Sequence, residues 1–261
     1  PSFSGQTATV TVNKLSTTDA FVVIDLDDAP VSTGIVRWAK RILVDGATNL
    51  ARVTTYTYAS FGIERGGASG GVSAPPDGRD AAIAAFVAEL ASQVDAGTLV
   101  LEPGKGVNRS DLAAWPIYAE GQADPAADHD QRLATGVVAA ADAALGGLSG
   151  ATVAVEDVGP ATAAIAAAFT AAGAEVAHQG ADVLGAEVDV LAIGSKPGVL
   201  AHELVPSLAC RVIVPTGPIP VTARALAHAR RRDIVVLPDF VSIAGPTLPV
   251  DVDVAAAVGA R

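Results

Sequence analysis

Two hydroxyl side chains, Thr57 and Ser69, lie in a glycine-rich segment, Thr55 to Gly71, which reads Thr-Tyr-Thr-Tyr-Ala-Ser-Phe-Gly-Ile-Glu-Arg-Gly-Gly-Ala-Ser-Gly-Gly. A hydroxyl group donates and accepts hydrogen bonds, but it carries no charge and exchanges no proton near neutral pH. Glycines let one backbone segment approach another closely, so the segment by itself also fits a glycine-rich turn. The segment can therefore bind through hydrogen bonds, but it contains no lysine amine for acid–base chemistry.

A cation outside this segment adds a second kind of chemistry. Arg37 ends the run Thr33-Gly34-Ile35-Val36-Arg37 and could hold a carboxylate ligand, or else form a structural ion pair with Asp25 or Asp27. The four histidines have no metal-ligand spacing, so no metal site is predicted. Cys210 lies in an apolar run, which predicts a buried and unreactive thiol.

The glycine-rich segment resembles, without a gap, a signature of the glutamate/leucine/phenylalanine/valine dehydrogenases: Thr-Tyr-Lys, followed at fixed spacing by Gly-Gly-Gly-Lys-Gly-Gly. Thr57 and Ser69 stand where that signature has its two lysines. Oxidative deamination needs one positive charge to hold the substrate carboxylate and one amine of lowered pKa to assist at the substrate carbon. The two replacements therefore remove the groups that would carry the family's reaction.

Further motifs extend the resemblance from about Phe21 to Thr247. The run that ends at Arg37 resembles the family's Gly-Gly-x-Arg strand, and Glu102-Pro103-Gly104-Lys105-Gly106 resembles a segment in which Gly104 replaces a proton-transferring aspartate. The family's catalytic positions would then be Thr57, Ser69 and Gly104. The residues that the resemblance implies for the substrate side are Gly34, Arg37, Tyr56, Gly66, Gly67 and Lys105.

The dinucleotide-binding turn is the sharpest test of a cofactor. Such a turn needs Gly-x-Gly-x-x-Gly after the first strand. Here the strand leads into Asp157-Val158-Gly159-Pro160-Ala161-Thr162, which keeps only Gly159. Asp157 is predicted to cap a helix that begins near Pro160 and to put a negative charge where a pyrophosphate would lie. The cofactor-side positions that the resemblance implies are Asp157, Gly159, Thr135 and Pro218. We expect no cofactor, with NAD(P) as the less favoured alternative.

Hydrophobic patterns divide the chain at an acidic segment near residues 121–130. The first half is expected to hold strands at 20–26, 31–41 and 98–101 and helices at 47–58, 80–94 and 111–115. The second is expected to hold helices at 131–145, 161–172, 200–207 and 222–230 and strands at 152–156, 175–178, 189–193, 212–214 and 234–237. Alternation of helices with apolar strands implies a parallel sheet. The predicted fold is two α/β domains: a substrate and oligomerisation domain, residues 1–125, and a shortened Rossmann-like domain, residues 126–261.

Bulk properties limit the partners. The net charge of −11 argues against nucleic acid and against anionic membrane surfaces. No apolar run is long enough for a secretory signal or a membrane span, so we expect a cytoplasmic protein. The apolar strand at Phe21–Ile24 would invite pairing if it lay at a sheet edge, which predicts a homodimer joined through residues 1–60. If that strand lies inside its own sheet, a monomer is expected instead.

The resemblance and the replacements lead to three hypotheses. The favoured one is a dehydrogenase-like protein that has lost oxidative deamination. It either serves as a regulatory or assembly subunit, with an active paralogue as one partner, or binds a small amino or keto acid. The second is a repurposed enzyme that works in the same site without a cofactor. The third is an active NAD(P)-dependent amino-acid dehydrogenase with unusual residues.

Overall fold

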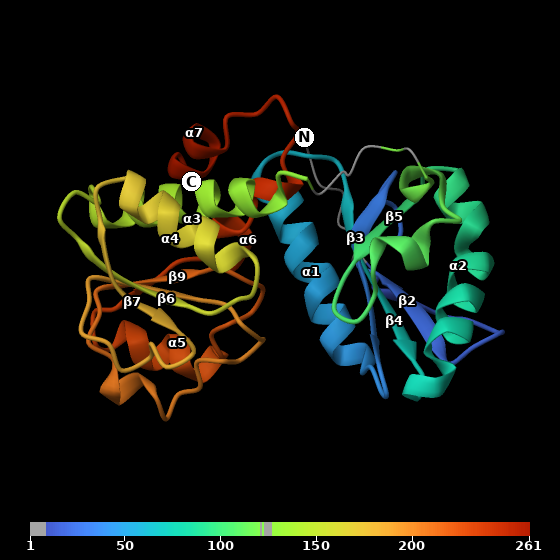
Figure 1. Cartoon of the computed structure of the whole chain (residues 1–261), viewed down its shortest axis with the longest axis horizontal. Coiled ribbons are helices and arrows are strands. Elements are labelled where there is room, and N and C mark those ends of the chain that lie inside the picture. Colours follow the sequence, from blue (N-terminus) through green and yellow to red (C-terminus); the bar gives the residue numbers. More distant parts are fainter. Residues whose placement is uncertain (1–8, 121, 123–126) are drawn as a thin grey trace. The chain divides into compact units, whose positions relative to one another are not determined.

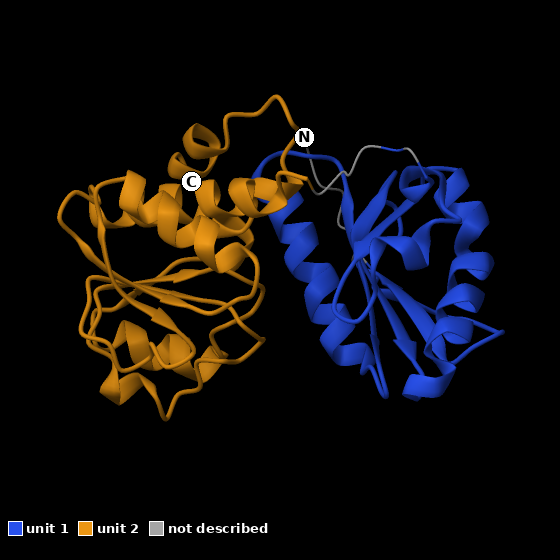
Figure 2. Ribbon diagram, in the orientation of Figure 1, with its two compact units in different colours: residues 1–124 blue, residues 125–261 orange. Residues whose placement is uncertain are grey.

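The structure is a computed structural model that describes residues 9–120, 122 and 127–261. The chain divides into two compact units, residues 1–124 and residues 125–261 (Figure 2). Each unit has a five-stranded sheet with helices on both of its faces, so the predicted α/β architecture is confirmed (Figure 1). Part of the acidic segment predicted to separate two domains lies outside the described residues.

Unit 1 is built on a mixed sheet with the strand order β1-β2-β4-β3-β5. The strands are β1 (Thr11–Lys14), β2 (Ala20–Ile24), β3 (Ser32–Ala39), β4 (Gly66–Ser73) and β5 (Leu99–Pro103). Helix α1 (Val44–Ser60) packs on β4 and β2 from one side, and α2 (Arg79–Asp95) covers the other side. Single 3-10 turns follow at η1 (Pro76–Gly78), η2 (Arg109–Leu112) and η3 (Pro116–Tyr118). Phe86 of α2 and Trp115 fill the core on the α2 side.

The glycine-rich segment runs from the end of α1 into the central strand β4, which contains its glycines from Gly66 to Gly71, so the interpretation of these glycines as a turn is wrong. The strand is buried because α1 lies directly on it. A Cβ atom at Gly67 would stand 1.7 Å from the carbonyl oxygen of Ala51 in α1. A Cβ atom at Gly34 would likewise stand 1.7 Å from the carbonyl oxygen of Ala68. Glycine is therefore required by close backbone approach within the layers, and not by chain reversal.

The strand that suggested a dimer also lies elsewhere than expected. β2 is paired on one side with β1 and on the other with β4, so it is an interior strand. Phe21 and Val23 point into the core beneath α1, and Val22 points into the core beneath α2. The argument for a dimer from an exposed apolar edge at β2 is thus wrong, because β1 covers that edge.

Unit 2 has a parallel sheet with the order β10-β9-β8-β6-β7. Its strands are β6 (Thr152–Glu156), β7 (Glu175–Gly180), β8 (Val190–Ile193), β9 (Val212–Pro215) and β10 (Val235–Val236). After β7 the chain crosses to the other side of β6 and adds β8, β9 and β10 in sequence. The direction of winding therefore reverses between β6 and β8, where open α/β sheets bind their ligands.

Helices cover both faces of this sheet (Figure 1). They are α3 (His129–Leu145), α4 (Ala161–Ala171), α5 (Ala223–Arg230), α6 (Asp239–Ser242) and α7 (Val254–Gly259), with 3-10 turns η4 (Val205–Ser207) and η5 (Gly245–Thr247). The helix predicted at 200–207 is wrong: only η4 is helical there. Leu200 instead forms a β-bridge with Val221, and Pro206 lies inside the short turn.

Candidate functional site

The two positions that carry hydroxyls instead of lysines lie on α1 and β4. Thr57 is buried, and its hydroxyl donates to the carbonyl oxygen of Val53 at 3.0 Å, so it is used within the helix. Ser69 is fully buried, with 0% of its surface exposed. Its hydroxyl has no hydrogen-bond partner among the described residues. The α1–β4 contact is fixed by a third hydroxyl, because Thr55 accepts from the backbone N–H of Gly67 at 2.9 Å.

Ser69 belongs to a group of unpartnered donors on one face of the unit 1 sheet. It is the register partner of Ile35 on β3, so the two side chains share a face, as do the residues two positions before and after Ile35. Those residues are Thr33 and Arg37. The Thr33 hydroxyl and the Arg37 Nε and Nη2 atoms are buried without a hydrogen-bond partner in the described part of the chain. Buried donors of this kind cost free energy until a partner arrives.

Arg37 is the cation of this group. Burial lowers the pKa of its guanidinium, because removal from water disfavours the charged form. The expected ion pair with Asp25 is wrong: Asp25 is paired with Arg52 at 3.3 Å instead. No ion pair of Arg37 with Asp27 occurs among the described residues. The guanidinium is therefore left as a partly desolvated cation that could receive an anion.

Gly104 could not hold the family's aspartate in this arrangement. A Cβ atom there would stand 2.8 Å from the carbonyl oxygen of Val36 and 3.0 Å from Cγ of Arg37. An aspartate at position 104 would therefore require the backbone of β3 to move. Lys105 is exposed, and its backbone carbonyl accepts from Trp38 at 2.9 Å. Tyr56 on α1 is 49% exposed. The structure thus brings Thr33, Arg37 and Ser69 onto one face, whereas Lys105 and Tyr56 lie at the surface.

The other glycine positions implied for substrate binding are buried in strands. Gly34 is on β3, and Gly66 and Gly67 begin β4. Their role in the structure is close packing, as the contacts of Gly34 and Gly67 show.

The turn after β6 satisfies its own backbone donors. Oδ1 of Asp157 accepts from the N–H of Gly159 at 3.0 Å and from the hydroxyl of Thr162 at 3.2 Å. The same hydroxyl accepts from the N–H of Val158 at 2.8 Å. The prediction that Asp157 caps the helix is wrong: α4 starts at Ala161, its N-cap is Pro160, and no side chain caps it. Asp157 closes the turn instead.

A buried carboxylate, which sequence reasoning missed, lies where the direction of winding reverses between β6 and β8. Glu156, the last residue of β6, is 4% exposed. Its Oε2 accepts from the backbone N–H groups of Gly194 at 2.7 Å and Ser195 at 3.0 Å, and its Oε1 accepts from the Ser195 hydroxyl at 2.5 Å. The available signal was an acidic residue at the end of an otherwise apolar central strand.

The residues present do not fit a dinucleotide in the ordinary way. A pyrophosphate needs free N–H groups in the turn after the first strand. Two of those groups are taken by Asp157 and Thr162, and the nearest carboxylates, Asp157 and Glu156, would repel the phosphates. Dinucleotide-binding domains have an acidic residue at the end of the second strand for the ribose hydroxyls, whereas β7 ends at Gly180.

The remaining cofactor-side positions contribute little that could bind a ligand. The Thr135 hydroxyl donates to the carbonyl oxygen of Gln131 within α3 at 2.9 Å. Pro218 precedes Ile219, whose φ of 55° is unusual for a β-branched residue. The carboxylate of Asp239 holds this loop through the N–H of Ile219 at 2.6 Å. Within the described ranges, no group of three or more His, Cys, Asp or Glu side chains could hold a metal ion.

Comparison with known proteins gives the fold. No family model and no curated protein sequence matches the chain. Among solved structures it is similar to the hetero-hexameric glutamate dehydrogenase from Thermus thermophilus in its Leu-bound form, with a TM-score of 0.73, 18% identity, and coverage of 97% of this chain and 75% of that one. The chain has an amino-acid-dehydrogenase-like fold.

Two further structures agree with this result. L-tryptophan dehydrogenase from Nostoc punctiforme matches with a TM-score of 0.68 and 17% identity over 96% of this chain and 85% of that one. Plasmodium falciparum glutamate dehydrogenase matches with a TM-score of 0.75 and 13% identity over 92% of this chain and 66% of that one. The resemblance read from the motifs is confirmed at the level of the fold. No helix within the described ranges is long and apolar enough to cross a membrane.

Proposed function

We propose that this chain is a glutamate/leucine/phenylalanine/valine dehydrogenase-like protein that has lost NAD-dependent oxidative deamination. It serves as a regulatory or assembly subunit, or as a binder of a small amino or keto acid. The observation that carries this proposal is Ser69: a fully buried hydroxyl stands where the family's signature has a lysine. A hydroxyl there can donate a hydrogen bond, but it cannot take a proton from the substrate amine near neutral pH.

The surroundings of that position support the same reading. The Thr57 hydroxyl donates a hydrogen bond to the carbonyl oxygen of Val53, and the packing around Gly104 leaves no space for an aspartate. All three positions of the family's reaction are thus filled by groups that neither titrate nor carry charge. Loss of a single residue could be offset by a neighbour, but at Thr57 and Gly104 the local contacts also suit the replacement.

A carboxylate ligand is supported by the unpartnered donors of unit 1. Arg37 offers a guanidinium, and Ser69 and Thr33 offer hydroxyls, on one face of the sheet. A carboxylate would give the guanidinium a charge-assisted hydrogen bond and relieve the cost of its burial. These same donors would also serve a repurposed enzyme without a cofactor, which a metabolite screen with an Arg37→Met control would reveal.

A role in an assembly is supported by one structural neighbour. The Thermus thermophilus glutamate dehydrogenase is described as hetero-hexameric and was solved with Leu bound. A protein of this fold can therefore be one of two kinds of subunit, and we expect this chain to form oligomers with itself or with an active paralogue.

An activity assay tests the proposal. The natural chain and Ser69→Ala are compared for NAD(P)-dependent oxidation of the common amino acids at equal protein concentration. The substitution removes only the hydroxyl, so it is a matched control for whatever chemistry that position retains. We expect no turnover from either protein. Turnover by the natural chain above that of Ser69→Ala would overturn the proposal.

A further inference from the structure

Helix α5 presents its larger side chains to solvent. It packs on the rest of unit 2 through the small buried residues Ala225 and Ala229. Its opposite stripe follows the i, i+3, i+4, i+7, i+8 spacing that normally faces a core. That stripe lines a hollow of about 570 Å³ and consists of Ala223, Leu226, Ala227, Arg230 and Arg231. Leu226 is 49% exposed. We call the hollow that these five residues line the α5 hollow.

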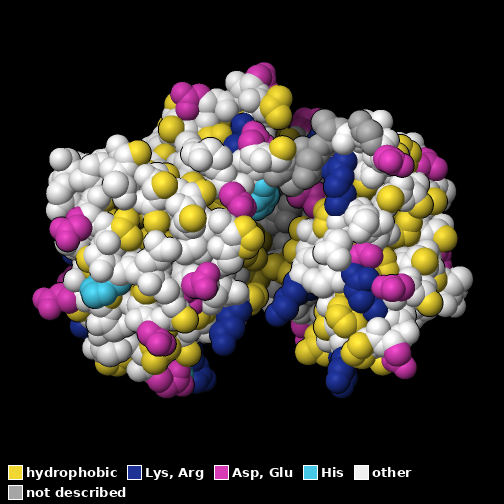
Figure 3. Space-filling model, in the orientation of Figure 1, with side chains coloured by type: hydrophobic (Ala, Val, Ile, Leu, Met, Phe, Trp, Pro, Cys, Tyr) yellow, Lys and Arg dark blue, Asp and Glu magenta, His cyan; other side chains and the backbone are white. Residues whose placement is uncertain are grey.

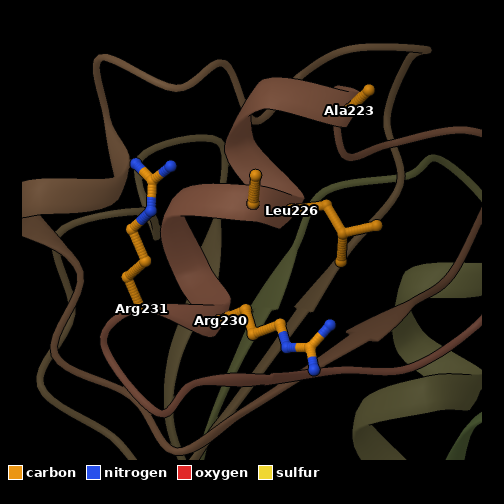
Figure 4. Close-up of a pocket in the computed structure, with 5 residues that line it drawn as sticks. Ala223, Leu226, Arg230 and Arg231 are labelled. Atoms are coloured by element: carbon orange, nitrogen blue, oxygen red, sulfur yellow. The ribbon is translucent and has the colours of Figure 1, made fainter.

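The α5 hollow is both apolar and basic. Figure 4 shows Leu226 and Arg230 reaching to the same side of the helix, with Arg231 on the other side. Leu204, which precedes the neighbouring turn η4, and Val235 of β10 add exposed apolar surface. In a chain of net charge −11 this combination selects a partner segment that is apolar and acidic.

The chain itself carries such a segment between η5 and α7. Val250 is 87% exposed and is followed by the exposed carboxylate of Asp251. Arg132 holds the backbone before it, because its guanidinium donates to the carbonyl oxygens of Gly245, Leu248 and Pro249 at 2.8–3.0 Å. Asp253 holds the backbone after it by capping α7 through the N–H of Ala256 at 3.1 Å. Val250 is thus an apolar knob on a fixed support.

The knob and the hollow are complementary in chemistry and lie apart in unit 2. Figure 1 shows α7 and the segment before it on the side of the sheet that α3 and α4 cover, with α5 on the opposite side. Figure 3 shows hydrophobic and acidic side chains next to each other at the projecting segment. A single copy cannot place its own knob in its own hollow, so a pairing of the two requires a second molecule.

We propose that the α5 hollow of one molecule receives the Val250 knob of a second copy of this chain. Val250 packs against Leu226, and the carboxylate of Asp251 pairs with Arg230, which reaches to the same side of α5 as Leu226. The contact is head-to-tail, because each copy offers a knob on one side and a hollow on the other. It therefore grows into rings or chains as concentration rises, and it weakens as salt screens the ion pairs.

Sedimentation velocity from micromolar to near-millimolar protein tests this contact. The hollow is changed by Arg230→Glu, and the knob by Val250→Ser with Asp251→Asn. We expect the average mass of the natural chain to rise with concentration at low salt, and each variant to lose this rise. An equimolar mixture of the two variants regains one contact and forms a single additional pairing that cannot grow further, because only one intact hollow and one intact knob meet.

Arg224→Glu is the matched control, since it makes the same charge change on α5 outside the hollow and should leave the rise intact. The proposal is overturned if the natural chain shows no rise, if Arg224→Glu acts like the hollow variant, or if the mixture behaves as its separate components do. Far-ultraviolet circular dichroism of each variant distinguishes a lost contact from a lost fold. A variant that unfolds is replaced by Leu226→Ser or Val250→Ser alone, each with the same expected loss.

Discussion

The candidate sites of the two units differ in how their polar groups are paired, although unit 2 also holds one buried hydroxyl, that of Thr216, without a hydrogen-bond partner among the described residues. In unit 1, the face shared by Thr33, Arg37 and Ser69 holds donors without partners. In unit 2, the turn after β6 and the end of that strand use their donors internally, through the carboxylates of Asp157 and Glu156. A binding site without its ligand contains donors that lack partners, whereas donors already paired within the protein cannot also bind a ligand. The comparison supports our proposal that unit 1 binds a small acid on this face and that the turn after β6 does not bind a dinucleotide in the ordinary way.

The largest expected effect comes from returning the lysine to β4. Ser69→Lys would bury an ammonium on a position with 0% exposure between Val23 and Ile35. We expect the free energy of unfolding to fall by about 3–5 kcal/mol, as for other uncompensated buried charges. Urea denaturation followed by circular dichroism measures it. In the matched variant Ser69→Ala the unpartnered hydroxyl is removed, so stability should stay unchanged or rise. Equal stability of Ser69→Lys and the natural chain would show that the position is open to solvent.

Glu156→Ala tests the hydrogen bonds that the buried carboxylate at the end of β6 makes with the chain after β8. Without the carboxylate, the N–H groups of Gly194 and Ser195 lose their acceptor in a buried place. We expect a loss of about 3 kcal/mol in the free energy of unfolding. Glu175→Ala, at an exposed position of the neighbouring strand, is the control and should cost little. If both substitutions cost the same, Glu156 does not hold β6 and β8 together.

Arg37→Met tests whether the face with Thr33, Arg37 and Ser69 binds a ligand. Methionine keeps much of the alkyl volume and removes the desolvated cation. We expect the free protein to gain about 1 kcal/mol, or a rise of about 2–4 °C in melting temperature, and to lose any stabilisation by amino or keto acids. Thermal-shift measurements with each acid decide this, with Arg65→Met on the surface as the control. A ligand-induced shift that survives in Arg37→Met would remove Arg37 from the binding site.

The smallest effect concerns Cys210, which reports on the opening of unit 2. Burial raises the pKa of this thiol to about 11, so at pH 8 it is almost entirely in the protonated, unreactive form. Unfolding would return the pKa to its ordinary value and increase the thiolate fraction. We expect labelling by a thiol reagent at pH 8 to be slow in the folded protein and fast in urea, and Glu156→Ala to label sooner than the natural chain. Cys210 is half-buried rather than fully buried as the sequence predicted, and rapid labelling of the folded chain would show that this partial burial does not protect the thiol.

Much of the fold could be predicted from sequence because apolar periodicity marks buried strands and helices directly. Strands β6, β8 and β9 and helices α2 and α4 have nearly their predicted bounds. The glycine-rich strand β4 was missed, because its residues lack the side chains on which strand patterns depend and their packing is visible only against α1. The helix expected at 200–207 failed because Leu200 bridges to Val221, a long-range contact that local propensity does not reveal.

The candidate site was predictable only in part. Motif spacing located Thr57 and Ser69, and β-alternation places Arg37 and Thr33 on the face of Ser69 once the strand register is known. The register itself, and hence this grouping, could not be read from one sequence. Asp157 was recognised as unfavourable for a pyrophosphate, but its bond to the N–H of Gly159 depends on the turn's conformation. Glu156 was missed because its partners lie on a different strand.

The central claim, that the turn after β6 does not bind a dinucleotide in the ordinary way, is tested most directly by calorimetric titration with NADH. The natural chain should bind NADH more weakly than about 1 mM, equivalent to about −4 kcal/mol. Asp157→Gly frees the N–H of Gly159 and removes one negative charge, so it should bind at least about tenfold more tightly than the natural chain. Stoichiometric binding of NADH by the natural chain at micromolar concentration would contradict the account.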